Sequence, residues 1–148
     1  MVGYHNRAEE DKKVFFEAGS YKWLRTGDLA RLDEQGYIYI LDRIKDMIKY
    51  KGYSVFPREV EEVLYEHPSV LECCVIGVKD PILGENIKVL IVLREEYKNK
   101  VKDQEIIDWS KENLAAYMYP RIVEFVDSLP KSPAGKVLKR RLREREEK

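Results

Sequence analysis

The sequence is poor in the residues that crosslink a chain or hold a metal. Its 148 residues include two cysteines and two histidines. The cysteines, Cys73 and Cys74, are adjacent, and adjacent cysteines rarely bond to each other. No cluster of further ligand-type residues accompanies them, so we expect neither a disulfide nor a metal site. Both lie in an apolar run, which favours buried thiols in a reducing, cytoplasmic environment.

The chain also lacks an excess of charge of either sign. It has 27 basic and 27 acidic residues, so no long-range field would attract nucleic acid. No run approaches the roughly 20 apolar residues of a membrane span, and residues 1–7 lack the apolar stretch of a secretory signal. Hydrophobic residues make up 44% of the sequence, which is enough for a packed core. We therefore expect a globular protein with no transmembrane segment and no nucleic-acid partner.

Residues 43–148 predict a small α+β domain, because apolar runs alternate with segments of helical spacing. A short hairpin is expected around Lys51-Gly52. We expect a three-stranded sheet flanked by helices, with this hairpin to one side. The expected strands are residues 70–78, 87–93 and 122–126. The expected helices begin at Pro57, behind Asp103 as an N-cap, and at Val137.

The first part of the chain predicts a hairpin without a core of its own. Residues 29–33 and 37–41 alternate as strands do, and Gly36 supplies a turn between them. Residues 18–20 are expected to form a loop. An isolated hairpin is marginal in water, so this part is expected to pack on something larger.

A loop rich in proline and glycine near the C-terminus predicts a presented cation. Pro130 and Pro133 restrict the backbone, and Gly135 permits a tight turn just before Lys136. A lysine at such a tip suits an oxygen that gains negative charge during a reaction. A solvated surface lysine is the alternative interpretation.

Three segments in order, residues 23–30, 41–53 and 130–140, resemble the adenylate-forming enzyme superfamily. This superfamily includes acyl- and aryl-CoA synthetases, luciferases and peptide-synthetase adenylation domains. The resemblance implies that residues 1–42 are the tail of a larger N-terminal adenylation domain and that residues 43–148 are its C-terminal mobile lid. The phosphate-binding loop and acyl pocket of the superfamily are missing here, so a fragment that is inactive alone is expected.

The run Lys49-Tyr50-Lys51-Gly52-Tyr53 is most similar to that of acyl-CoA and coumarate-CoA-type ligases and luciferases. The resemblance implies an ATP-dependent, AMP-forming carboxylic acid–CoA ligase. Its partners would be ATP or AMP, CoA, the carboxylic acid and the missing N-terminal domain, with Mg²⁺ ligands outside this chain. The alternatives are a peptide-synthetase adenylation domain, a luciferase-like enzyme, or a non-catalytic α+β binding module.

The resemblance also implies roles for individual residues. Lys136 matches the catalytic lysine of adenylation. Asp28 matches the residue that holds the ATP ribose, although an Asx-turn would also explain it. Arg43 would lie near the ribose and phosphates, or else form an ion pair with Asp42 or Asp46. Lys45 falls at the hinge between the two bodies, where an ordinary surface lysine is the alternative.

A second set of residues matches the face that the lid presents after it rotates. Lys49, Lys51, Gly52 and Tyr53 would line the path of the CoA thiol, with Lys49 alternatively a polar strand residue. The pair Gly84-Glu85 also matches a superfamily loop, and we expect a structural role for it. The basic residues Lys139, Arg140 and Arg141 are hypothesised to bind CoA phosphates rather than nucleic acid.

Overall fold

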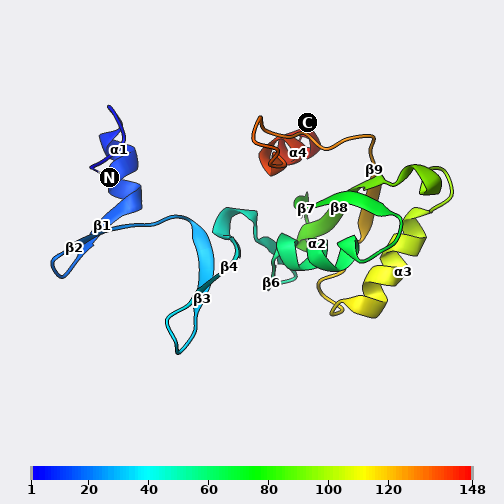
Figure 1. The fold of residues 1–148 in the computed structure, drawn as a ribbon, viewed down its shortest axis with the longest axis horizontal. Helices are drawn as coiled ribbons and strands as arrows, with labels where there is room; N and C mark the ends of the chain where they lie inside the picture. Colours follow the sequence, from blue (N-terminus) through cyan, green and yellow to red (C-terminus); the bar gives the residue numbers. More distant parts are fainter. Residues whose placement is uncertain (1, 148) are drawn as a thin grey trace. The chain divides into compact units, whose positions relative to one another are not determined.

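The structure, a computed structural model, describes residues 2–147 (Figure 1). Its internal contacts divide the chain into two compact units, Met1–Lys45 and Asp46–Lys148. The division falls inside the short 3-10 turn η1, Ile44–Asp46. It therefore lies close to the expected boundary after residue 42.

The first unit consists of one short helix and two antiparallel hairpins. Its elements are α1 (Ala8–Val14), β1 (Phe15–Ala18), β2 (Tyr21–Leu24), β3 (Asp28–Leu32) and β4 (Ile38–Arg43). The hairpin β3–β4 is the predicted one. The hairpin β1–β2 was not predicted: residues 18–20 were expected to form a loop, whereas Ala18 ends β1 and Gly19 and Ser20 form the turn. Every residue of β1 and β2 is at least partly exposed, so the sequence has no alternation of apolar and polar residues that would predict these two strands.

No residue between 2 and 45 is buried. Large apolar side chains instead face outwards on both hairpins, among them Trp23, which is 52% exposed, and Ile38, which is 67% exposed. A unit of this kind has no hydrophobic core of its own and must gain its stability elsewhere.

The second unit is built on a five-stranded sheet. Its strands are β5 (Ile48–Tyr50), β6 (Tyr53–Val55), β7 (Val70–Asp80), β8 (Gly84–Leu93) and β9 (Ile122–Phe125). The order is β6-β5-β8-β7, and β9 pairs in parallel with β8. The three predicted strands are β7, β8 and β9. The predicted hairpin is not set to one side, because Tyr50 pairs with Gly84 and adds β5 and β6 to the sheet.

Both faces of this sheet are covered, as the alternation along β8 requires. Val89 and Ile91 pack with α2 (Pro57–Tyr65) and α3 (Asp103–Asn113) in one apolar cluster. Leu90 and Val92 pack with Leu142 of α4 (Lys139–Glu146) in the other. Helix α3 begins after Lys102, so Asp103 is its first residue and not the expected cap. No helix formed by residues 2–147 is long and apolar enough to cross a membrane.

The outer edge of β7 is closed by side chains of α2. The Glu61 carboxylate accepts a hydrogen bond from the Val75 N–H at 2.7 Å, and the Tyr65 hydroxyl lies 3.4 Å from the Cys73 nitrogen. An edge strand with unpaired N–H groups is a template for aggregation, so these two side chains protect β7.

The two thiols are buried on opposite faces of β7, as their neighbouring positions require. Burial and the nearby Glu61 carboxylate raise the pKa of the Cys73 thiol, and burial raises the pKa of Cys74 to about 12. Because the thiolate is the nucleophile, both thiols are expected to be unreactive in the folded chain.

We therefore predict that a chromogenic disulfide reagent at pH 8 labels neither cysteine until the chain unfolds. In guanidinium both should react at once. Cys73→Ser and Cys74→Ser variants, each labelled in denaturant, assign the signals. Rapid labelling of either thiol in the native chain would contradict the observed packing of β7.

Candidate functional site

The loop that carries Lys136 is held by its own backbone. The Ser132 N–H donates to the Lys136 carbonyl at 2.8 Å, and the Gly135 N–H donates to the Ser132 carbonyl at 2.9 Å. The Ser132 hydroxyl in turn accepts from the Lys136 N–H at 3.2 Å. Gly135 has φ +77°, a conformation that glycine adopts without strain. The turn predicted from proline and glycine is therefore present.

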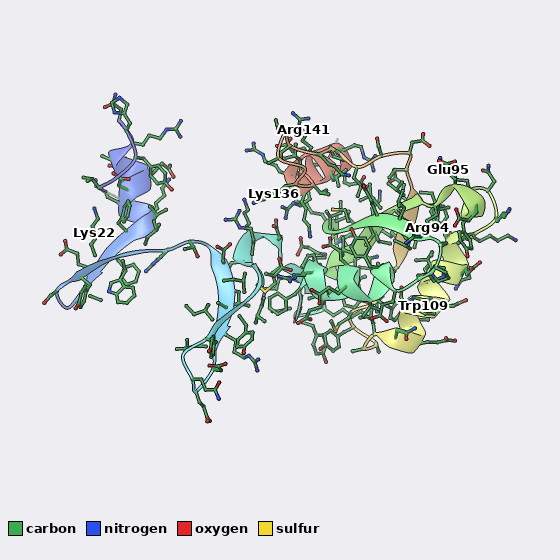
Figure 2. The ribbon with its side chains drawn as sticks, in the orientation of Figure 1. Lys22, Arg94, Glu95, Trp109, Lys136 and Arg141 are labelled. Atoms are coloured by element: carbon green, nitrogen blue, oxygen red, sulfur yellow. The ribbon has the colours of Figure 1, made fainter. Side chains whose placement is uncertain are left out.

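The Lys136 side chain is exposed at this turn, and Figure 2 shows it in the loop before α4. Within residues 2–147, no acidic side chain forms an ion pair with Lys136. The two other lysines of the segment do have partners: Lys131 pairs with Glu72 at 2.5 Å and Lys139 with Glu61 at 2.8 Å. The loop thus leaves one ammonium group available to a ligand.

Asp28 and Arg43 face each other across the hairpin β3–β4. They are partners in its register, and the Arg43 Nε donates to the Asp28 Oδ1 at 2.9 Å. The ion pair expected from Arg43 to Asp42 or Asp46 is thus made to Asp28 instead. Asp46 pairs with Arg143 of α4.

A hollow of about 740 Å³ lies at this end of the hairpin. Thr26, Gly27, Asp28 and Arg43 contribute to its lining, together with Lys45. The Thr26 hydroxyl accepts from the Asp28 N–H at 3.1 Å, and the Asp28 Oδ1 atom accepts from the Arg43 Nε. The carboxylate of Asp28 and the guanidinium of Arg43 therefore stand together where a ribose or phosphate oxygen could reach both.

Lys45 is exposed within the turn η1, at the last position of the first unit. The preceding residue is fixed, because the Ile44 N–H donates to the Gly27 carbonyl at 2.9 Å. A single backbone crossing therefore links the two units at Lys45.

Lys49, Lys51, Gly52 and Tyr53 all belong to the hairpin β5–β6. The turn residues Lys51 and Gly52 have φ values of +49° and +83°, as a two-residue type I′ turn requires. The Lys49 ammonium donates a hydrogen bond to the Ser54 hydroxyl at 2.7 Å, as expected of a polar strand residue.

The side chain of Glu85 holds the hairpin β5–β6 through a hydrogen bond to its backbone. Its carboxylate accepts from the Lys49 N–H at 2.6 Å and lies over Gly77. A side chain at Gly77 would place its Cβ 2.6 Å from the Glu85 Oε1, so the glycine makes room for the carboxylate. This is the structural role expected for Glu85.

A cluster of aromatic and basic side chains lies next to the hairpin β5–β6, and the sequence did not predict it. Tyr53 stacks on Tyr117 with ring centroids 4.6 Å apart. The Arg121 guanidinium lies 3.7 Å from the ring centroid of Tyr119 and 4.2 Å from that of Tyr50. The run from Tyr117 to Arg121 was the available signal, but without the sheet nothing placed it beside Tyr53.

Most basic side chains of the C-terminal tail, residues 139–145, form ion pairs. Lys139 pairs with Glu61, and Arg140 pairs with Glu144 on its own helix at 2.7 Å. Of the three residues hypothesised to bind CoA phosphates, Arg141 alone has no ion pair within residues 2–147. The Lys139 pair is largely withdrawn from solvent, whereas the side chain of Arg140 is 89% exposed, so the structure argues against phosphate binding only at Lys139.

Lys88, a buried lysine that contacts α4, was not predicted from the sequence either. Lys88 of β8 is 7% exposed and forms ion pairs with Glu124 at 2.7 Å and Glu146 at 2.6 Å. Burial disfavours its charge, but hydrogen bonds to the two carboxylates raise the pKa of Lys88. These contacts join β8, β9 and the end of α4. Within residues 2–147, no three histidine, cysteine or acidic side chains are grouped as a metal would need.

Comparison with known proteins gives a consistent result. The family described as "AMP-binding enzyme C-terminal domain" matches residues 59–136. A long-chain-fatty-acid–CoA ligase of Bacillus subtilis is 43% identical over 99% of the chain, and the chain spans 25% of that protein.

Solved structures agree with this match. ATP-bound MatB from Rhodopseudomonas palustris is 34% identical with a TM-score of 0.86, over 97% of this chain and 27% of that one. An o-succinylbenzoate–CoA synthetase from Bacillus subtilis, in complex with its acyl-adenylate intermediate, is 37% identical with a TM-score of 0.82, over 96% and 28%. The chain therefore spans about a quarter of the length of these relatives.

The turn of β5–β6 provides a direct test of the local geometry. A side chain at residue 52 would meet no atom within 4 Å, so Gly52→Ala adds only backbone strain. We expect it to lower the free energy of unfolding by about 1–2 kcal/mol, measured by urea denaturation followed by circular dichroism. The matched change Lys51→Asn should cost nothing, because asparagine tolerates positive φ. Equal stability of the Gly52→Ala chain and the parent would contradict the type I′ turn.

Proposed function

The chain belongs to the AMP-binding enzyme C-terminal domain family, and we propose that it is the C-terminal part of an ATP-dependent, AMP-forming carboxylic acid–CoA ligase. The observation that carries this proposal is the exposed, unpaired Lys136 on a loop tied by its own hydrogen bonds. The relatives named as CoA ligases and synthetases, four times longer than the matched region, support it.

In the first step, a carboxylate oxygen of the acid attacks the α-phosphorus of ATP. A new phosphorus–oxygen bond forms, the bond to pyrophosphate breaks, and the products are an acyl-adenylate and pyrophosphate. Negative charge gathers on the oxygens around phosphorus. Lys136 supplies a positive charge there and aligns the two reactants.

Asp28 and Arg43 are proposed to hold the nucleotide. The carboxylate of Asp28 can accept hydrogen bonds from both ribose hydroxyls. Arg43, which is always charged, fixes one Asp28 oxygen and offers its other N–H groups to ribose or phosphate oxygens. The ion pair therefore orients the carboxylate before ATP binds, and the hollow beside it provides room.

Lys45 is proposed as the hinge. Two units joined by a single backbone crossing can change orientation through a few dihedral angles at that crossing. An exposed, polar side chain can remain hydrated in both orientations. Rotation would withdraw Lys136 after adenylation and bring the hairpin β5–β6 to the acyl-adenylate.

In the second step, the CoA thiol attacks the acyl carbon and AMP leaves. We propose that Lys49, Lys51, Gly52 and Tyr53 line the thiol's path. Gly52 has no side chain to obstruct the pantetheine, and Lys51 presents a cation at the turn. The stacked Tyr53 and Tyr117 stiffen this surface.

The remaining partner is a larger N-terminal domain. The absence of any buried residue between 2 and 45, together with exposed residues such as Trp23 and Ile38, supports packing of this unit on such a domain. Mg²⁺ would enter with ATP, and the proposal assigns none of its ligands to this chain.

Pyrophosphate exchange tests the proposal in the full-length enzyme. Lys136→Ala should slow acid-dependent exchange of pyrophosphate into ATP by about 100- to 1000-fold, because one charge-stabilising donor is lost. Conversion of a supplied acyl-adenylate and CoA to thioester should stay unchanged. Lys100→Ala, at another exposed lysine, is the matched control and should exchange normally. Full exchange activity of the Lys136→Ala enzyme would refute the proposal.

A further inference from the structure

The loop that carries Lys136 is anchored at both of its ends, to the edge strand β7 and to helix α2. Lys131 precedes the turn and pairs with Glu72 of β7, and Lys139 follows it and pairs with Glu61 of α2. The two arms of the loop also pair with each other: Lys131 bridges Val137, and the Leu138 N–H donates to the Pro130 carbonyl at 2.8 Å. Lys136 therefore has little slack relative to these two anchors.

The two anchors differ in burial. The side chains of Lys131 and Glu72 are 41% and 32% exposed, whereas those of Lys139 and Glu61 are 20% and 17% exposed. Solvent-exposed ion pairs contribute little, because water screens them and long side chains lose entropy. The half-buried pair at Lys139 is consequently the stronger constraint on the loop.

Glu61 is also fixed by the sheet itself. Its Oε1 atom accepts the Val75 N–H at 2.7 Å and lies 2.8 Å from the Lys139 ammonium. One carboxylate oxygen thus joins the backbone of β7 to the first residue of α4. The backbone of β7 is stiff, so its contact with Glu61 fixes the Glu61 carboxylate, and the carboxylate in turn fixes Lys139. Lys136 lies three residues before Lys139 and is positioned by it.

We propose that Glu61 is a positioning residue for Lys136: through Lys139, it sets where the Lys136 ammonium meets the α-phosphate of ATP. The inference rests on the proposed role of Lys136. Adenylation depends steeply on placement, and a shift of about 1 Å can cost about 100-fold. Thioester formation, which uses the hairpin β5–β6, does not involve this loop, so Glu61 should matter in the first step alone.

The substitution Glu61→Gln in the full-length enzyme isolates this role. Glutamine keeps an oxygen that can accept the Val75 N–H but removes the charge that holds Lys139. We expect pyrophosphate exchange to fall by about 10- to 100-fold and thioester formation from supplied acyl-adenylate to remain unchanged. Glu62→Gln is the matched control, since Glu62 is exposed on the same helix and pairs only with Arg58 among residues 2–147.

A second comparison separates positioning from a general structural role. In a Lys136→Ala background, Glu61→Gln should slow exchange no further, because its target is already gone. Lys139→Met should reproduce the loss, Lys139→Arg should keep most of the rate, and Glu61→Gln with Lys139→Met should be no worse than either alone.

Several results would overturn the inference. These are normal exchange by the Glu61→Gln enzyme, equal loss in both steps, or a further loss in the Lys136→Ala background. Failure of the proposed function would look different: the parent enzyme itself would show no exchange, or Lys136→Ala would leave it intact, and the inference would fall with it.

Discussion

The second unit depends on a strand that is apolar on both faces. From Val89 to Leu93, every residue of β8 is buried, and the side chains alternate between two clusters. Such a strand cannot lie at a surface, so it needs neighbours on both edges and cover on both faces. Strand β7 occupies one edge, and β5 and β9 share the other. Helices α2 and α3 cover one face and α4 the other.

The cover of the second face is held by charge as well as by packing. Helix α4 buries only Leu142, so apolar contact alone would hold it weakly. Lys88 of β8 and Arg143 of α4 add ion pairs to Glu146 and Asp46, respectively. A buried lysine that lost its carboxylates would be costly, which ties the helix to this position. The loop that carries Lys136 lies immediately before a helix that is therefore well fixed.

The periodicity of apolar residues predicted those helices and strands whose side chains form the core. Val60 and Leu64 are spaced as a helix face requires. The apolar run at residues 70–78 predicted a central strand, but β7 lies at the edge of the sheet, where side chains of α2 cover it. The hairpin β1–β2 was invisible, since its residues are exposed and show no alternation. The pairing of β5 with β8 was not predicted either, because it depends on the single register pair of Tyr50 with Gly84.

The candidate site shows the same limit. The residues themselves came from three motifs, and the turn at Gly135 followed from its composition. The partner of Arg43 did not, because Asp28 lies across a hairpin whose register shifts between Leu29 and Ala30. Ion pairs between distant residues, such as Lys139 with Glu61, depend on tertiary structure that no local pattern encodes.

Net neutrality has a structural meaning in this chain. Equal numbers of basic and acidic residues would allow every cation to be paired, yet Lys136 has no partner within residues 2–147 while Lys131 and Lys139 do. An unpaired ammonium that stays in water has no desolvation cost to offset, and it keeps its full charge for a ligand. A paired one would first have to break its bond. The neighbouring pairs therefore fix the loop, and the absence of a pair at Lys136 leaves the charge at its tip available to a ligand, as the proposed role of Lys136 requires.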